Sequence, residues 1–141
     1  MITTLHIENY VLIDLLDIRF ERGLNIITGE TGAGKSILLG AIGMLTGARA
    51  DSSVVKNGAT TCVIEAEFEV SDYDLEPLFE EYDLDYSDTM IVRRVITVQG
   101  KSRSYVNDLP VTLAQLKSIG ERLIDIHSQH QTLLLGDGGF Q

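Results

Sequence analysis

The sequence has few of the features that mark secreted or membrane-spanning proteins. Cys62 is the only cysteine among the 141 residues, so no disulfide can form within the chain. No apolar run approaches the roughly 18 residues of a membrane-spanning helix, and the N-terminus lacks a basic segment followed by an apolar core. We therefore expect a cytoplasmic protein with no membrane partner, in which Cys62 is a small core residue.

Basic residues are missing from one long stretch of the chain. Residues 65–88 contain eleven of the 21 acidic residues and no lysine or arginine, whereas the remainder is close to neutral. The formal charge of −10 therefore neither supports nor excludes a polyanionic partner such as DNA. A solvated face joined to a surface loop, with a short helix opening near Glu76, is the favoured interpretation of this acidic segment. A docking site for a basic partner is the alternative.

The most informative stretch is residues 29–36, which fits the phosphate-loop (Walker A) pattern G-x-x-x-x-G-K-[ST] without a mismatch. Its glycines let backbone N–H groups approach a polyphosphate. Lys35 would reach the β- and γ-phosphates, and the Ser36 hydroxyl would coordinate Mg²⁺. The residues predicted to bind the nucleotide are Gly29, Glu30, Thr31, Gly32, Ala33, Gly34, Lys35 and Ser36.

The flanks of this loop predict a strand-loop-helix unit. Residues 24–28 form a short apolar run typical of a buried strand, and apolar residues then recur at helical spacing over residues 37–45. A helix that starts directly after the loop places its N-terminus and dipole next to the anion. Gly40 and Gly43 suggest close packing of this helix on a sheet, and Gly47 is its predicted end.

Other patterns predict an antiparallel sheet beside this unit. Residues 1–22 form two strands, residues 61–70 alternate apolar and polar side chains, and residues 90–107 form a hairpin that turns at residues 99–102. The expected fold is α/β, with a mixed sheet whose parallel core surrounds the phosphate-loop strand. An antiparallel subdomain is expected from about residues 1–22 and 61–107.

The predicted hairpin carries a basic cluster with a tyrosine among the cations. Its members are Arg93, Arg94, Lys101, Arg103 and Tyr105. Such residues are the usual electrostatic footprint of nucleic-acid binding. Charge pairing with the acidic segment is the favoured interpretation, and contact with DNA phosphates is the alternative. Leu109-Pro110 then breaks the strand pattern.

The C-terminal part is predicted to contain a short helix and then a buried strand. Thr112 and Gln115 resemble a capping box for a helix that ends at about Ile119. Residues 123–126 form a short apolar run typical of a buried strand.

This predicted strand leads into a cluster of amides and imidazoles at residues 127–131, where ligands of α/β proteins often bind. Asp125 is a candidate for an acid that holds Mg²⁺. His127 and His130 are possible metal ligands, but no acidic or thiol partner stands at a suitable spacing.

Four stretches resemble the N-terminal head segment of the RecN family, the bacterial SMC-like ATPases of DNA double-strand-break repair. They are Leu5–Ile13, Thr28–Ser36, Gly47–Ala50 and Asp125–His130. The resemblance spans nearly the whole chain. It implies an ABC-type (SMC-like) ATPase head that is split in sequence, so that a coiled coil and a C-terminal half of the head would follow this lobe.

The resemblance also implies roles for individual residues. Gln129, in a glutamine loop at about residues 127–131, would reach Mg²⁺ and the attacking water. Lys35 and Gln129 would then be catalytic, and Ser36 and Gln129 would bind Mg²⁺. Lys56 stands where SMC-like heads usually carry an arginine near the phosphates, but lysine cannot make the bidentate contact of arginine. Ser128 replaces the glycine common in the family.

By the same resemblance, the cofactors are ATP and Mg²⁺, and ATP would lie between two heads of a homodimer. The further partners would be the C-terminal half of the same head and DNA, in the bacterial cytoplasm and nucleoid. The chain alone should hydrolyse little ATP, because the acids of the C-terminal half are missing. A self-contained kinase or GTPase that uses Asp125, and a nucleotide-independent assembly module, are the alternatives.

Overall fold

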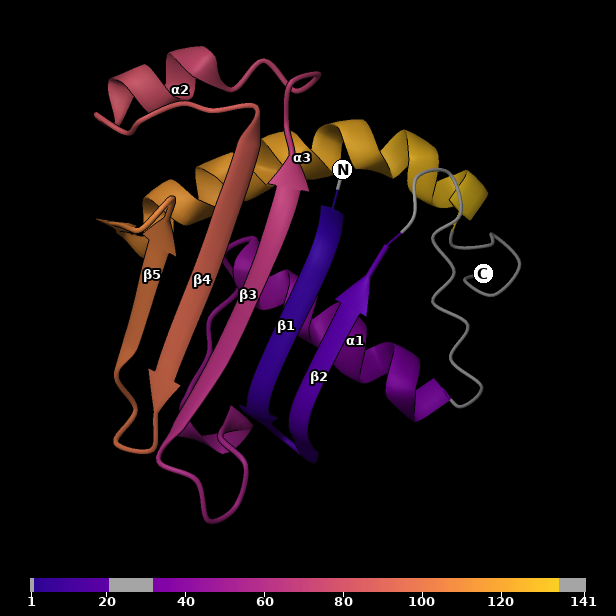
Figure 1. Ribbon diagram of the computed structural model, residues 1–141, viewed down its shortest axis with the longest axis vertical. Coiled ribbons are helices and arrows are strands. Elements are labelled where there is room, and N and C mark those ends of the chain that lie inside the picture. The colour runs from indigo at the N-terminus through magenta and orange to yellow at the C-terminus, as the bar shows by residue number, and fades with distance from the viewer. Residues whose placement is uncertain (1, 21–31, 135–141) are drawn as a thin grey trace.

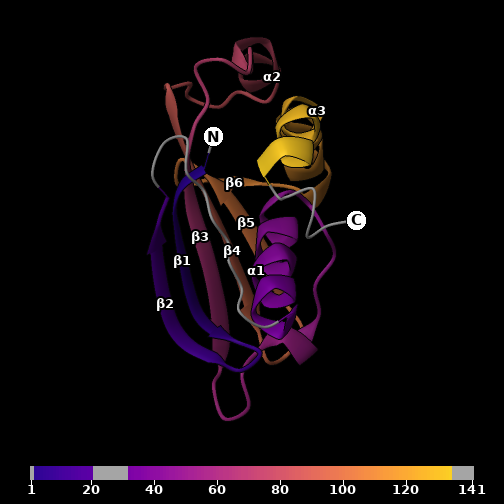
Figure 2. The same cartoon turned by 90° about the vertical axis from the view of Figure 1, so that its right-hand side faces the viewer.

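The computed structural model describes the backbone of residues 2–20 and 32–134 and the side chains of residues 2–20 and 37–123. Six strands form one sheet in the order β2-β1-β3-β4-β5-β6, and helices cover one of its faces (Figures 1 and 2). The strands are β1 (Ile2–Tyr10), β2 (Ile13–Arg19), β3 (Thr61–Glu69), β4 (Thr89–Thr97), β5 (Ser102–Val106) and β6 (Leu109–Val111). The helices are α1 (Gly32–Leu45), the 3₁₀ turn η1 (Ser52–Val54), α2 (Glu76–Glu81) and α3 (Leu113–Leu134).

All strand pairs within the described residues are antiparallel, which confirms the antiparallel sheet expected from the sequence. The parallel core expected around residues 24–28 lies outside the described residues. β6 is an addition, because Leu109-Pro110 was expected to break the strand pattern and instead starts a short edge strand. Proline is tolerated there, since an edge strand leaves some N–H groups without a partner strand.

The alternation of side chains in β3 explains the two faces of the sheet. Cys62, Ile64 and Ala66 are buried on the helix-covered face, whereas Glu65 and Glu67 point to the opposite face and are partly exposed. A strand places successive side chains on opposite faces, so this pattern commits one face to the core and the other to water. We call these the covered face and the open face.

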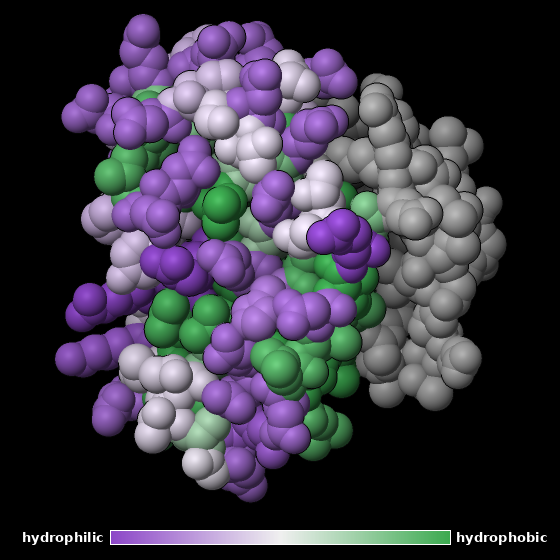
Figure 3. Space-filling view, viewed as in Figure 1, coloured by the Kyte–Doolittle hydropathy of each residue, from purple (hydrophilic) through white to green (hydrophobic). Residues whose placement is uncertain are grey.

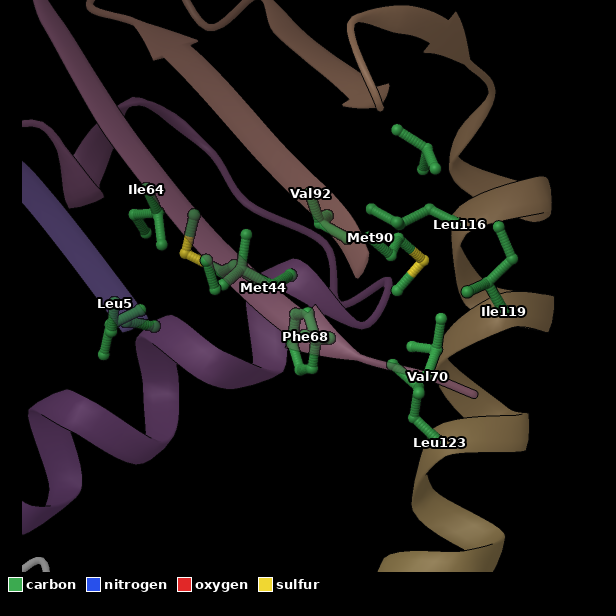
Figure 4. Packing of buried hydrophobic residues seen from close by; sticks show 14 of the residues in the cluster. Leu5, Met44, Ile64, Phe68, Val70, Met90, Val92, Leu116, Ile119 and Leu123 are labelled. Carbon is green, nitrogen blue, oxygen red and sulfur yellow. The ribbon is translucent and has the colours of Figure 1, made fainter. Parts of the chain in front are cut away.

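The core lies between the covered face and helices α1 and α3. Figure 4 shows Leu5 of β1, Ile64 and Phe68 of β3, and Met90 and Val92 of β4 packed with Met44 of α1 and with Leu116, Ile119 and Leu123 of α3. All of these side chains are at most 4% exposed. Burial of each large apolar side chain contributes about 1.5–3 kcal/mol, so this core is the main source of stability.

The open face carries a row of polar side chains that crosses five strands. Strand pairing places Asp17 beside His6, His6 beside Glu65, Glu65 beside Arg93, and Arg93 beside Tyr105. Hydrophilic and hydrophobic residues are interspersed on this side of the molecule (Figure 3).

The C-terminal segment differs from the sequence-based prediction. A single helix, α3, runs from Leu113 to Leu134, so both the strand expected at residues 123–126 and the loop expected at residues 127–131 are wrong. The capping box at its start is confirmed, because the Gln115 amide N–H donates to Thr112 Oγ1 (3.1 Å) and the Thr112 N–H donates to Gln115 Oε1 (3.0 Å). The helix continues because Leu116, Ile119 and Leu123 recur at helical spacing and are all buried.

Candidate nucleotide-binding site

α1 begins at Gly32, inside the phosphate-loop motif. The helix expected after the loop is therefore confirmed, and residues 32–36 form its first turns. The first N–H groups of a helix have no partner within it, and they favour an anion at this end. Gly29, Glu30 and Thr31 lie outside the described residues, as do the side chains of Ala33, Lys35 and Ser36.

The C-terminal end of α1 closes in the way that the sequence predicts. Gly47 has a φ of +107°, a conformation that favours glycine. Its N–H donates to the Met44 carbonyl (3.4 Å), and the Ala48 N–H donates to the Gly43 carbonyl (3.0 Å). This pair of hydrogen bonds is the Schellman arrangement of helix ends, so Gly47 is confirmed as the stop.

Arg94 of β4 also contacts this end of α1. The side chain is 0% exposed, and its Nη1 donates to the carbonyls of Met44 (2.8 Å) and Ala48 (2.7 Å). Its Nη2 donates to Ser102 Oγ of β5 (2.6 Å). Burial lowers the pKa of Arg94, but arginine remains protonated at physiological pH. A cation therefore sits at the negative pole of the helix whose positive pole carries the phosphate loop.

Two of the glycines within α1, Gly40 and Gly43, differ in their packing. A Cβ at Gly40 would lie 2.8 Å from the Tyr10 hydroxyl, so close packing of α1 on β1 is confirmed at this position. A Cβ at Gly43 would meet nothing within 4 Å, so the same expectation is wrong for Gly43.

Lys56 lies beside the tip of the β1–β2 hairpin. Its backbone N–H donates to the Asn9 carbonyl (2.8 Å), and its Nζ forms an ion pair with Asp14 Oδ1 (3.0 Å). The Asp14 side chain is 82% exposed, and exposed pairs contribute only about 0–1 kcal/mol, so a stronger anion could replace it. A phosphate contact by Lys56 stays a prediction.

Gln129, His127 and His130 belong to α3, and only their backbone is described. Asp125 also lies within this helix, so it does not follow a strand as an acid of the Walker B type would. The sequence contained a signal for this helix, namely the buried Leu116, Ile119 and Leu123 at spacings of three and four. Gly120 and the apolar run at residues 123–126 obscured it.

α1 and α3 meet where backbone contacts backbone. A Cβ at Gly120 of α3 would lie 2.4 Å from the carbonyl oxygen of Thr46, and a Cβ at Gly47 would lie 2.6 Å from Cα of Lys117. The helix that starts in the phosphate loop and the helix that carries Gln129 are therefore held together at one close crossing.

The predicted basic cluster is divided between the two faces. Arg93 lies on the open face, with Nη1 at 3.7 Å from Glu65 Oε2 and 3.4 Å from Asp108 Oδ1, and its guanidinium lies 4.7 Å from the centre of the Tyr105 ring. Pairing with the acidic segment is thus confirmed for Arg93. Arg94 is buried, whereas Lys101 and Arg103 are exposed, so the alternative of contact with DNA phosphates stays a hypothesis that concerns these two side chains.

A family model described as an AAA domain matches residues 4–135. The chain belongs to the AAA domain family. The chain is similar to the DNA repair protein RecN of Bacillus subtilis (strain 168), with 44% identity over 137 residues, and to that of Xylella fastidiosa (strain Temecula1), with 39% identity over 137 residues. The matches cover 96% and 95% of this chain but 24% and 25% of the two proteins, so this AAA domain spans about a quarter of their length.

The fold of this AAA domain matches that of SMC-type heads. A solved chain from work on ATP-driven dimerization and DNA-stimulated activation of SMC ATPases superposes with a TM-score of 0.69 and 21% identity, covering 87% of this chain and 79% of that one. The ABC-type, SMC-like head fold and the similarity to RecN that the motifs predict are both confirmed. None of the helices within residues 2–20 and 32–134 is long and apolar enough to cross a membrane.

Proposed function

We propose that this chain is the N-terminal, ATP-binding lobe of a RecN-like ATPase that acts in DNA double-strand-break repair and recombination. The observation that carries the proposal is that α1 begins within the phosphate-loop motif, in a domain similar to RecN over almost its whole length. A loop of this composition at a helix N-terminus is a ready site for a polyphosphate.

The residues act together in a defined way. The backbone of residues 29–34 wraps the phosphates, Lys35 binds the β- and γ-phosphates, and Ser36 and Gln129 coordinate Mg²⁺. Lys56 adds a second cation beside the loop. When bound with Mg²⁺, ATP would supply the phosphoryl group that water attacks. The residues of this chain would hold the nucleotide, and Gln129 would orient the water.

The rest of the site comes from outside this chain. We propose that the C-terminal half of the head supplies the acids that complete the Mg²⁺ site, and that a second head closes over ATP. ATP binding then drives head dimerisation, and hydrolysis releases the heads and resets the protein on DNA in the bacterial cytoplasm and nucleoid. The similarity in fold to the solved chain from work on ATP-driven dimerization of SMC ATPases supports this proposal.

The test is ATP hydrolysis by this chain alone and after addition of the C-terminal part of its natural parent. We expect turnover only in the mixture, and its loss in Lys35→Ala, which removes a charge-assisted phosphate contact of about 2–4 kcal/mol. The matched control is Lys117→Ala, because Lys117 is exposed on α3 and alanine keeps its helix and Cβ.

Two results would overturn the proposal. Turnover by the chain alone would favour a self-contained kinase or GTPase. That alternative uses Asp125 as the acid that holds Mg²⁺, but Asp125 lies within α3 and not at the end of a strand. Undiminished function in Lys35→Ala would favour a nucleotide-independent assembly module.

A further inference from the structure

We propose that Arg94 is a positioning residue for the nucleotide site, because it anchors the end of α1 opposite the phosphate loop to strands β4 and β5. This inference rests on the proposed ATP binding. It assigns a function to a cation that the sequence places in a basic hairpin and that the structure places in the core.

The contacts of Arg94 are unusual for a fully buried cation. Its three hydrogen bonds, to the carbonyls of Met44 and Ala48 and to the Ser102 hydroxyl, all go to neutral oxygens. Its Nε is buried and has no hydrogen-bond partner among the described residues. No carboxylate within the described part of the chain forms an ion pair with Arg94, so the negative pole of α1 balances its charge there.

An apolar side chain would fit this position with a smaller desolvation cost. Met90, Val92 and Ile96 lie on the same face of β4 and are each 0% exposed, so the position belongs to an apolar row. Replacement of a buried charge by a well-packed apolar residue is often neutral or stabilising. What methionine cannot do is hold the carbonyls of α1 and the hydroxyl of β5 at the same time.

The contacts of Arg94 matter for the phosphate loop because α1 is a long rigid helix, so a small tilt at one end displaces the other end. Its 14 residues span about 21 Å at 1.5 Å per residue. A tilt of about 3° at the anchored end then moves the loop end by about 1 Å. A misplacement of about 1 Å can cost about a hundredfold in catalysis, so a small loss of anchoring is enough to weaken the site.

Two substitutions separate positioning from stability. Arg94→Met fills the space. The Met44 carbonyl still accepts a hydrogen bond from the Gly47 N–H, and the Ala48 carbonyl belongs to an exposed residue, where water can replace the lost bond. We expect it to fold with a melting temperature close to that of the wild type. Arg94→Lys keeps the charge but cannot reach the carbonyls and Ser102 together. The matched control is Arg93→Met, one residue away on the open face.

The measurements are the MgATP dissociation constant by calorimetry, KM and kcat of the natural protein that contains this chain, and thermal unfolding. We expect Arg94→Met to weaken MgATP binding by about tenfold or more and to raise KM, Arg94→Lys to lie between it and the wild type, and Arg93→Met to match the wild type. A purely structural role would instead lower the folded fraction, and so kcat, without a change in KM.

Wild-type MgATP affinity in folded Arg94→Met would overturn the inference. If Arg94→Met does not fold, Arg94→Lys decides, because a wild-type KM in that variant would overturn it equally. Failure of the proposed function is distinguishable, since neither the wild type nor Lys35→Ala would then respond to MgATP at all.

Discussion

Arg93 and Arg94 are consecutive residues of β4, but their side chains lie on opposite faces of the sheet. Arg93 lies on the open face between Glu65 and Asp108 and against Tyr105, with 32% of its side chain exposed. Arg94 lies on the covered face, fully buried against the end of α1. Two identical side chains therefore have the same charge and very different surroundings.

The difference shows what burial does to the role of a charge. On the open face, water screens each ion pair, and the loss of one partner leaves the other solvated. On the covered face, the guanidinium is itself removed from water and supplies hydrogen bonds to carbonyls at a helix end. The covered face should therefore be sensitive to truncation and the open face tolerant of it.

The largest effect is expected from Arg94→Ala. This substitution removes three hydrogen bonds and leaves a cavity that alanine cannot fill, so the free energy of unfolding should fall by about 3–5 kcal/mol. Arg93→Ala should cost about 1 kcal/mol or less. Urea denaturation of the two variants measures both values, and equal losses would remove the distinction between the faces.

A smaller effect is expected in the helices, where Gly120 of α3 and Gly43 of α1 allow the same comparison between a tightly packed position and an open one. Gly120→Ala places a Cβ against the Thr46 carbonyl oxygen, so α3 must shift, and the expected loss of stability is about 1–3 kcal/mol. Gly43→Ala meets nothing within 4 Å and should gain about 1 kcal/mol from helix propensity. Thermal unfolding of the pair checks this prediction. A gain in both variants would show that α1 and α3 do not cross closely.

The smallest effect concerns His6 on the open face. Hydrogen bonds to Glu8 (2.6 Å) and then to Asp17 (2.5 Å) raise the pKa of His6 above its ordinary value of 6.5. A raised folded-state pKa stabilises the protein below the unfolded pKa, and this stability is lost as the pH rises through the folded pKa. The contribution of such exposed pairs is about 1 kcal/mol or less.

The prediction is that part of the stability disappears as the pH rises from about 6.5, the ordinary pKa of histidine, through the raised pKa of His6, and that His6→Gln removes this part of the pH dependence. Urea denaturation across this range measures it. An unchanged pH profile in His6→Gln would assign the effect to other groups.

Much of the sheet was predictable, because a half-buried strand records its two environments in every second residue. The alternation from Cys62 to Val70 predicts β3 and its polar outer face, and the Gln99–Ser102 turn predicts the β4–β5 hairpin. The start and end of α1 were also predictable, because the phosphate-loop pattern and Gly47 are local signals.

The rest depended on contacts between distant residues. Residues 123–126 form a short apolar run, and that local pattern favours a strand, but the segment is part of α3, whose Leu116, Ile119 and Leu123 pack in the core. The sequence-based prediction placed Arg94 in one basic cluster with Arg93 because the two residues are consecutive in the chain. The place of Arg94 in the row of Met90, Val92 and Ile96 was a signal that it points inward, but its partner, the end of α1, lies about 50 residues earlier in the sequence.

The burial of Cys62 has a practical consequence for future experiments. This thiol is 0% exposed, and burial raises its pKa to about 11, so it is scarcely ionised at neutral pH and resists maleimides and similar reagents. A single cysteine introduced at Leu12, which is 80% exposed at the tip of the β1–β2 hairpin, would therefore react selectively. A fluorophore there would sit on the hairpin against which Lys56 packs, in a protein whose native cysteine needs no replacement.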